Sequence, residues 1–152
     1  MSVLPSAENS HNSTETAEVG LTVEYIACGE ELLCCIIRAR SSPAQTTFLT
    51  PSESNLQVGY IVYAAGQEIP RHVHLPVERR LQRTGEVLVV QEGRCEVDVY
   101  SDARELIATR TLEPHDIVVI LAGGHGFRLL EDTVLLEVKQ GPYSAGKDKA
   151  RF

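Results

Sequence analysis

Hydrophobic and polar positions alternate over short distances in this chain. In Cys95–Tyr100, for example, Cys, Val and Val alternate with Glu, Asp and Tyr. Successive side chains of a β-strand face opposite sides, so this alternation predicts a strand with one buried and one solvated face. The pattern therefore favours β-structure over helix here.

Similar segments rich in Val, Ile, Leu and Tyr recur along the chain, and turn-forming residues separate many of them, as at Gln91–Arg94, Glu113–Asp116 and Gly123–Gly124. Many short strands at regular spacing indicate an all-β sandwich or barrel with little helix. The predicted strands are Leu21–Ala27, Leu32–Ala39, Gln45–Leu49, Val58–Ala64, Pro70–Leu75, Glu86–Gln91, Cys95–Ser101, Leu106–Leu112, Ile117–Leu121, Gly126–Leu130 and Val134–Lys139.

The ends of the chain differ in composition from its middle. Residues 1–19 are rich in Ser, Asn, Thr and Glu, and such a stretch buries too little apolar surface to offset its ordering entropy. We therefore expect a flexible N-terminal tail over 1–19, one β-domain over 20–143 and a polar C-terminal tail over 144–152.

Charge and cysteine content narrow the function classes. The 152 residues carry a net charge of -7, with 21 acidic and 14 basic residues, which argues against nucleic-acid or anionic-membrane binding. No apolar run approaches the roughly 18 residues of a membrane helix, and no secretory signal is evident. Four cysteines without a CxxC pair indicate reduced, mostly buried thiols in a cytoplasmic protein.

The candidate chemistry centres on two histidines. His72 and His74 are two residues apart in a predicted strand, so their imidazoles face the same side, as two ligands of one metal do. His125 follows Gly123–Gly124 and supplies a third imidazole. An acidic fourth ligand has two candidates, Glu78 and Glu86.

These residues resemble the motifs of the cupin superfamily. Its first motif reads Gly, five residues, His-x-His, three or four residues, Glu, six residues, Gly, and Gly66, His72, His74, Glu78 and Gly85 match it literally. The second motif is looser. Pro-His-Asp at positions 114–116 stands where cupins often have Pro-Gly-Asp, the third histidine follows at 125, and the final Asn of that motif is absent.

We nevertheless expect Glu86, and not Glu78, to be the carboxylate ligand. The stretch from Glu78 to Gly85 carries three arginines and has little β-propensity. The stretch from Glu86 to Gly93 has the same Glu-to-Gly spacing and is a clean apolar strand that runs into a turn. Cupins place the ligand Glu at the head of such a strand, which leaves Glu78 as the alternative.

The resemblance implies a double-stranded β-helix that forms a jelly-roll barrel. It also implies one divalent transition metal (Fe, Mn, Ni or Zn), bound by His72, His74, Glu86 and His125, and a homodimer. The expected ligand is a small polar organic molecule such as a sugar or an oxyacid. The resemblance leaves two alternatives: a metal-dependent enzyme, such as a dioxygenase or isomerase of polysaccharide sugar metabolism, or a non-catalytic binding or sensory cupin. No catalytic residue is assigned.

The arginines after the histidine pair suggest a source of specificity. Arg71, Arg80 and Arg83 either form a solvated loop or act as a lid whose guanidinium groups bind a carboxylate or phosphate. We expect Phe127 in the core or the pocket wall. Glu137 and Lys139 share a strand face, and we expect them to form an exposed pair.

Overall fold

The chain folds as an assembly of antiparallel strands. The computed structural model describes residues 11–18, 20–144 and 148–152, and these residues contain strands and no helix. The strands are β1 (His11–Glu18), β2 (Leu21–Cys28), β3 (Glu31–Ile37), β4 (Thr47–Phe48), β5 (Gly59–Tyr60), β6 (Glu86–Glu92), β7 (Cys95–Tyr100), β8 (Leu106–Leu112), β9 (Ile117–Ile120), β10 (Gly124–Leu129) and β11 (Val134–Lys139).

The described strands form three sheets. The largest has the order β1-β2-β3-β9-β6-β11, the second has the order β10-β7-β8, and β4 pairs with β5. All neighbouring strands are antiparallel. Inward-facing side chains of the two larger sheets form one core cluster, in which β3, β6 and β9 of the first sheet meet β7 and β8 of the second. The fold is thus all-β, as the sequence predicts.

The six-stranded sheet is apolar on both faces, which explains the continuous hydrophobic run of β3. Cys34 and Ile36 belong to the inner core, while Cys35 and Ile37 face a second cluster under residues 49–60. Strands buried on both faces read as unbroken apolar runs. Burial raises the pKa of the Cys35 thiol to about 12. None of the four cysteines forms a disulfide, and all but the half-buried Cys28 are buried, which confirms the prediction that the thiols are mostly buried.

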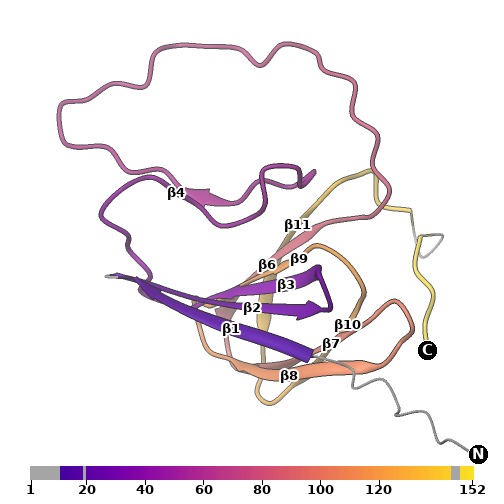
Figure 1. Ribbon diagram of the computed structural model, residues 1–152. Coiled ribbons are helices and arrows are strands. Elements are labelled where there is room, and N and C mark those ends of the chain that lie inside the picture. The colour runs from indigo at the N-terminus through magenta and orange to yellow at the C-terminus, as the bar shows by residue number, and fades with distance from the viewer. Residues whose placement is uncertain (1–10, 19, 145–147) are drawn as a thin grey trace, which may run out of the picture.

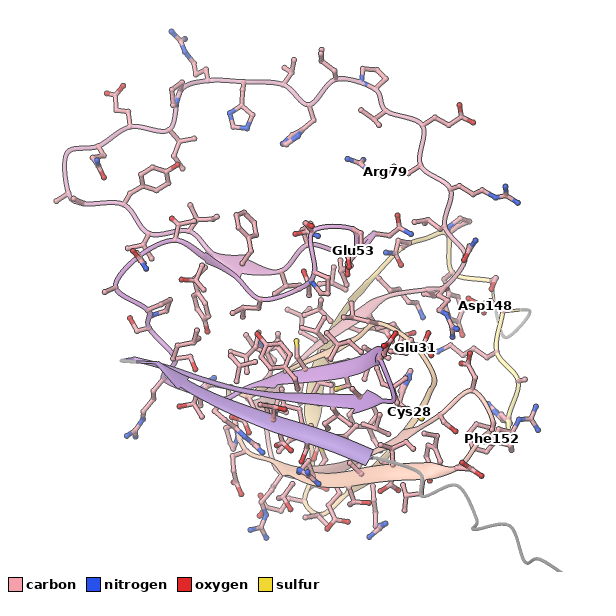
Figure 2. All side chains as sticks on the ribbon, in the orientation of Figure 1. Cys28, Glu31, Glu53, Arg79, Asp148 and Phe152 are labelled. Carbon is pink, nitrogen blue, oxygen red and sulfur yellow. The ribbon has the colours of Figure 1, made fainter. Side chains whose placement is uncertain are left out.

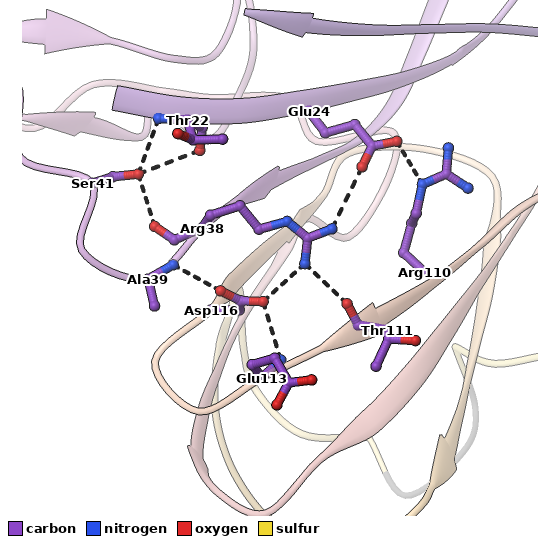
Figure 3. A network of polar contacts seen from close by, with 9 residues as sticks. All are labelled: Thr22, Glu24, Arg38, Ala39, Ser41, Arg110, Thr111, Glu113 and Asp116. Atoms are coloured by element: carbon purple, nitrogen blue, oxygen red, sulfur yellow. Dashed lines mark hydrogen bonds and ion pairs between the residues drawn. The ribbon is translucent and has the colours of Figure 1, made fainter. Parts of the chain in front are cut away.

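A polar network around the buried Asp116 carboxylate ties the end of β3 to the turn between β8 and β9 (Figure 3). The carboxylate of Asp116 accepts hydrogen bonds from Arg38 Nη1 at 2.9 Å and from the backbone N–H groups of Ala39 and Glu113 at 2.7 and 3.1 Å. Arg38 also donates to the Thr111 carbonyl at 2.9 Å. Buried polar groups are costly without partners, so separating these segments is unfavourable. The network therefore holds the end of β3 against the turn between β8 and β9.

The N-terminal prediction is wrong over part of its range. His11–Glu18 form β1, which pairs with β2 from His11↔Cys28 to Glu18↔Leu21. Gly20, with φ +83°, has the left-handed conformation that a tight hairpin connection requires. An edge strand is held mainly by main-chain hydrogen bonds, so a polar composition does not exclude it. Residues 1–10 and 19 of the predicted tail lie outside the described residues.

A predicted strand is also absent from the segment that leads to β6. Residues 61–83 run in a wide arch away from the sheets (Figure 1), and Pro70–Leu75 form no strand there. Val73 and Leu75 are 82% and 76% exposed. Alternation of apolar residues cannot make a strand without a neighbouring strand to bond to, and in this structure Pro70–Leu75 have none.

Candidate functional site

Glu86 supplies a carboxylate to the interior from the first position of β6. It pairs with Ile120 of β9 and with Lys139 of β11, and it shares the inner face of β6 with Leu88 and Val90. Its side chain is only 5% exposed. A charge this deeply buried requires a compensating partner, so its surroundings decide what the site can hold.

His125 approaches Glu86 from the opposite sheet. It lies on β10 across from Val99, with its Nε2 atom 3.0 Å from Oε2 of Glu86. The turn before β10 needs glycine, because Gly123 has φ +68° and a Cβ there would collide with the Tyr100 carbonyl oxygen. Close approach of this turn to the end of β7 therefore sets the position of His125.

The arrangement leaves one buried carboxylate oxygen incompletely satisfied. The distance from His125 to Oε2 of Glu86 is that of a contact, yet no described donor is directed at this oxygen with hydrogen-bond geometry. Buried oxygens without a directed donor are uncommon and costly. A carboxylate and an imidazole that face each other in this way are suitable ligands for a divalent transition metal.

Lys139 also belongs to this site, which corrects the prediction of an exposed pair with Glu137. The Lys139 side chain is 12% exposed, and its Nζ lies 3.2 Å from Glu137 and 3.8 Å from Oε1 of Glu86. The hydrogen bond to Glu137, with a smaller contribution from Glu86, raises the pKa of Lys139. Lys149 Nζ lies 3.9 Å from the same Oε1 atom.

The other two predicted ligands lie elsewhere. His72 and His74 are exposed on the arch, with ring centroids 5.3 Å apart. Their rings are neighbours, as expected for residues two apart in an extended chain. Among the described residues no three His, Cys, Asp or Glu side chains gather into a metal-binding group. The structure thus brings together Glu86 and His125 of the four predicted ligands.

The remaining predicted site residues divide between the arch and the core. Glu78, Arg71 and Arg80 are exposed on the arch, whose course is seen in Figure 2 around the label of Arg79. Phe127 packs against the core, with its ring centroid 5.9 Å from that of His125.

Arg83 stands where the arch rejoins the sheets. It donates to both oxygens of Asp102 at 2.7 and 2.6 Å, and its Nη2 lies 3.1 Å from Glu31. The paired hydrogen bonds raise the pKa of Arg83 and lower that of Asp102. Arg83 therefore has two carboxylate partners within the protein.

A cavity of about 870 Å³ opens beside the Glu86–His125 pair. Tyr100 and Arg104 contribute to its wall, and so do residues 148–152 near the C-terminus. Phe152 stands edge-on to Tyr100, with ring centroids 5.2 Å apart. Arg104 was not identified from the sequence, since nothing in the sequence relates a turn residue to a distant strand.

No protein-family model, curated protein or solved structure matched the chain when it was compared with each of these sets. A search of the described residues for a helix of sufficient length and apolarity to cross a membrane found none.

Proposed function

We propose that this protein is a metal-binding β-barrel of the cupin kind that binds a small polar organic molecule at one divalent metal. The observation that carries the proposal is the buried Glu86 carboxylate, whose Oε2 atom faces His125 and lacks a directed donor. A divalent cation held by the two groups would compensate the buried charge. His72 and His74 of the arch would complete the ligand set.

The donor set suits Fe(II), Mn(II), Ni(II) or Zn(II) and does not choose among them. When bound, such a metal acts as a Lewis acid on an oxygen of the ligand. Glu86 and His125 are held on strands of two facing sheets, so their positions are fixed before the metal arrives. The other two proposed ligands, His72 and His74, lie on the arch and not on a strand.

Closure of the arch is part of this proposal. In the described chain β10 pairs only with β7, so its outer edge is free to accept another strand. An extended segment that docks along β10 would present His72 and His74 on one face and Val73 and Leu75 on the other. Docking would also cover these two apolar side chains, which are now mostly exposed.

The lysines beside Glu86 favour a second candidate function, that of a metal-free binding protein. Lys139 and Lys149 lie 3.8 and 3.9 Å from Oε1 of Glu86 and offset its charge without a metal. In such a protein the cavity would hold a metabolite without turnover. Metal uptake separates the two candidates.

The test is metal binding by chelator-stripped protein, measured by calorimetry and by elemental analysis after reloading with each of the four metals. We expect one metal per chain, and at least about tenfold weaker binding for His72→Ala, Glu86→Gln and His125→Ala. Glu78→Gln is the matched control and keeps wild-type affinity. Folded wild-type protein that takes up none of the four metals would overturn the proposal, and so would loss of affinity in Glu78→Gln but not in Glu86→Gln.

A further inference from the structure

We infer that the cavity contains an anion-binding subsite at Arg104, and that the ligand of this protein therefore carries a carboxylate or phosphate group. The inference rests on the proposed function, because it places the anionic end of the ligand opposite the Glu86–His125 end of the same cavity. Three observations that do not involve a metal also support it: the local charge, a guanidinium that no described carboxylate pairs with, and the turn that holds this guanidinium.

The cavity is cationic although the protein is acidic. Its lining includes the cations Arg83, Arg104, Lys149 and Arg151, against the carboxylates of Glu86 and Asp148. The chain as a whole has a net charge of -7. A pocket of opposite sign to the rest of the molecule concentrates anions and steers them inward.

Not all of these cations are available to a ligand. Arg83 is engaged by Asp102 and Glu31, and Lys149 faces Glu86. Arg104, by contrast, has no carboxylate within ion-pair distance among the described residues. Its guanidinium lies over the ring of Phe152, 5.3 Å from the ring centroid, a contact that orients it without using its N–H donors.

The backbone holds Arg104 in a conformation that few side chains adopt. Its φ is +66°, in the left-handed region where Gly or Asn is more usual. The turn is closed by hydrogen bonds from Arg104 N to the Ser101 carbonyl and from Ser101 N to the Glu105 carbonyl, each 2.9 Å long. A strained residue that is fixed at a cavity rim is a mark of a functional position.

The turn connects Arg104 to the metal side of the cavity. It follows Tyr100, which pairs with Gly124, the residue before His125. A Cβ on Gly124 would approach the Phe152 ring to 3.1 Å, so ring and strand are in close contact. Arg104, Phe152 and His125 thus belong to one continuous wall.

The positions of Arg104 and of the Glu86–His125 pair define which class of ligand fits the cavity. One end offers an oxygen donor to the Glu86–His125 pair, and the other places a planar or tetrahedral oxyanion on the guanidinium fork of Arg104. Tyr100 and Phe152 cover the carbon skeleton between the two ends. Both organic carboxylates and organic phosphates meet this description.

The experiment is calorimetric titration of malonate and of inorganic phosphate into metal-free and Mn(II)-loaded protein. For the anion that binds wild type more tightly, we expect Arg104→Ala to weaken binding at least about tenfold. Arg104→Lys keeps the charge but not the fork, and is expected to lie between the two. The Mn(II) stoichiometry remains that of wild type.

The matched control is Arg40→Ala. Arg40 is also an exposed arginine at positive φ, +67°, but it does not line the cavity. The substitution therefore changes net charge and turn strain equally, and it should leave anion affinity unchanged. Preference for malonate or for phosphate identifies the ligand as a carboxylate or a phosphate.

The outcomes separate this inference from the proposed function. Equal anion affinities of Arg104→Ala and Arg40→Ala, or no binding of either anion by folded wild type, would overturn the subsite even if Mn(II) binds. Conversely, if wild type takes up no metal but Arg104→Ala selectively loses anion affinity, the metal proposal fails and the subsite stands.

Discussion

Replacing Asp116 by Ala should destabilise the fold strongly, although this aspartate does not line the cavity. Asp116 is 2% exposed and accepts hydrogen bonds from Arg38, Ala39 and Glu113 (Figure 3). The substitution leaves two backbone N–H groups without their acceptor and removes the nearer carboxylate partner of Arg38, which keeps its contacts with the Thr111 carbonyl and with Glu24. Loss of one partner of a buried ion pair typically costs about 3–5 kcal/mol. Because Arg38 is 31% exposed, we expect the lower end, about 3 kcal/mol.

Asp102→Ala is the control that separates the effect of burial on the stability loss from the effect of contact length. Asp102 binds Arg83 through two hydrogen bonds of 2.7 and 2.6 Å, both shorter than the 2.9 Å contact from Arg38 to Asp116. Its side chain is 57% exposed, and exposed ion pairs contribute about 1 kcal/mol or less. Contact length alone would predict the opposite order of the two losses.

The assay is urea unfolding at pH 7, followed by far-ultraviolet circular dichroism because the chain has no Trp. With an m-value of about 2 kcal/mol per molar urea, Asp116→Ala should lower the midpoint by about 1.5 M and Asp102→Ala by less than about 0.5 M. Equal shifts of the two midpoints, or a larger shift for Asp102→Ala, would show that burial does not decide the free-energy cost.

Two further predictions concern the interior and the turn before β10. Burial raises the pKa of Cys35 to about 12 from an ordinary value of 9.0, so the folded protein retains this proton when the unfolded chain releases it. Stability is then fully present below pH 9 and falls as the pH rises from 9 toward 12, by up to about 1.4 kcal/mol per pH unit. Urea midpoints from pH 8 to 10 should fall more steeply in wild type than in Cys35→Ala, and parallel curves would contradict the assignment. Gly123→Ala should cost about 2 kcal/mol or more, because it combines a positive φ with a collision against the Tyr100 carbonyl. Gly126→Ala is its control, since a Cβ there meets nothing within 4 Å, and thermal melting that ranks Gly126→Ala as the more damaging would exclude this account of the turn.

The sequence predicted most of the strands because their own side chains encode them. The alternation in Cys95–Tyr100 and the apolar run of Ile117–Ile120 both coincide with observed strands. Strand β1 was not predicted because an edge strand is held mainly by main-chain hydrogen bonds. Amino-acid composition does not indicate these bonds. The strand predicted at Pro70–Leu75 is absent for the converse reason. Its residues alternate as a strand requires, but no neighbouring strand pairs with them in this structure.

The candidate site was predictable to the extent that strands position it. Preference for a glutamate at the head of an apolar strand led to Glu86, and the structure buries this residue beside His125 while Glu78 is exposed on the arch. Arg104 and Lys149 were not predictable, because a turn and a terminal segment reach the cavity only through the tertiary fold. Sequence spacing carries no information on such contacts.

Glu86 and His125 are proposed to share one metal with His72 and His74. X-ray absorption spectroscopy of protein loaded with one Ni(II) or Zn(II) per chain tests this claim, because scattering from imidazole rings counts the bound histidines. We predict three imidazole ligands in wild type and one in the double variant His72→Ala, His74→Ala. A wild-type spectrum with a single imidazole that the double variant leaves unchanged would contradict the claim.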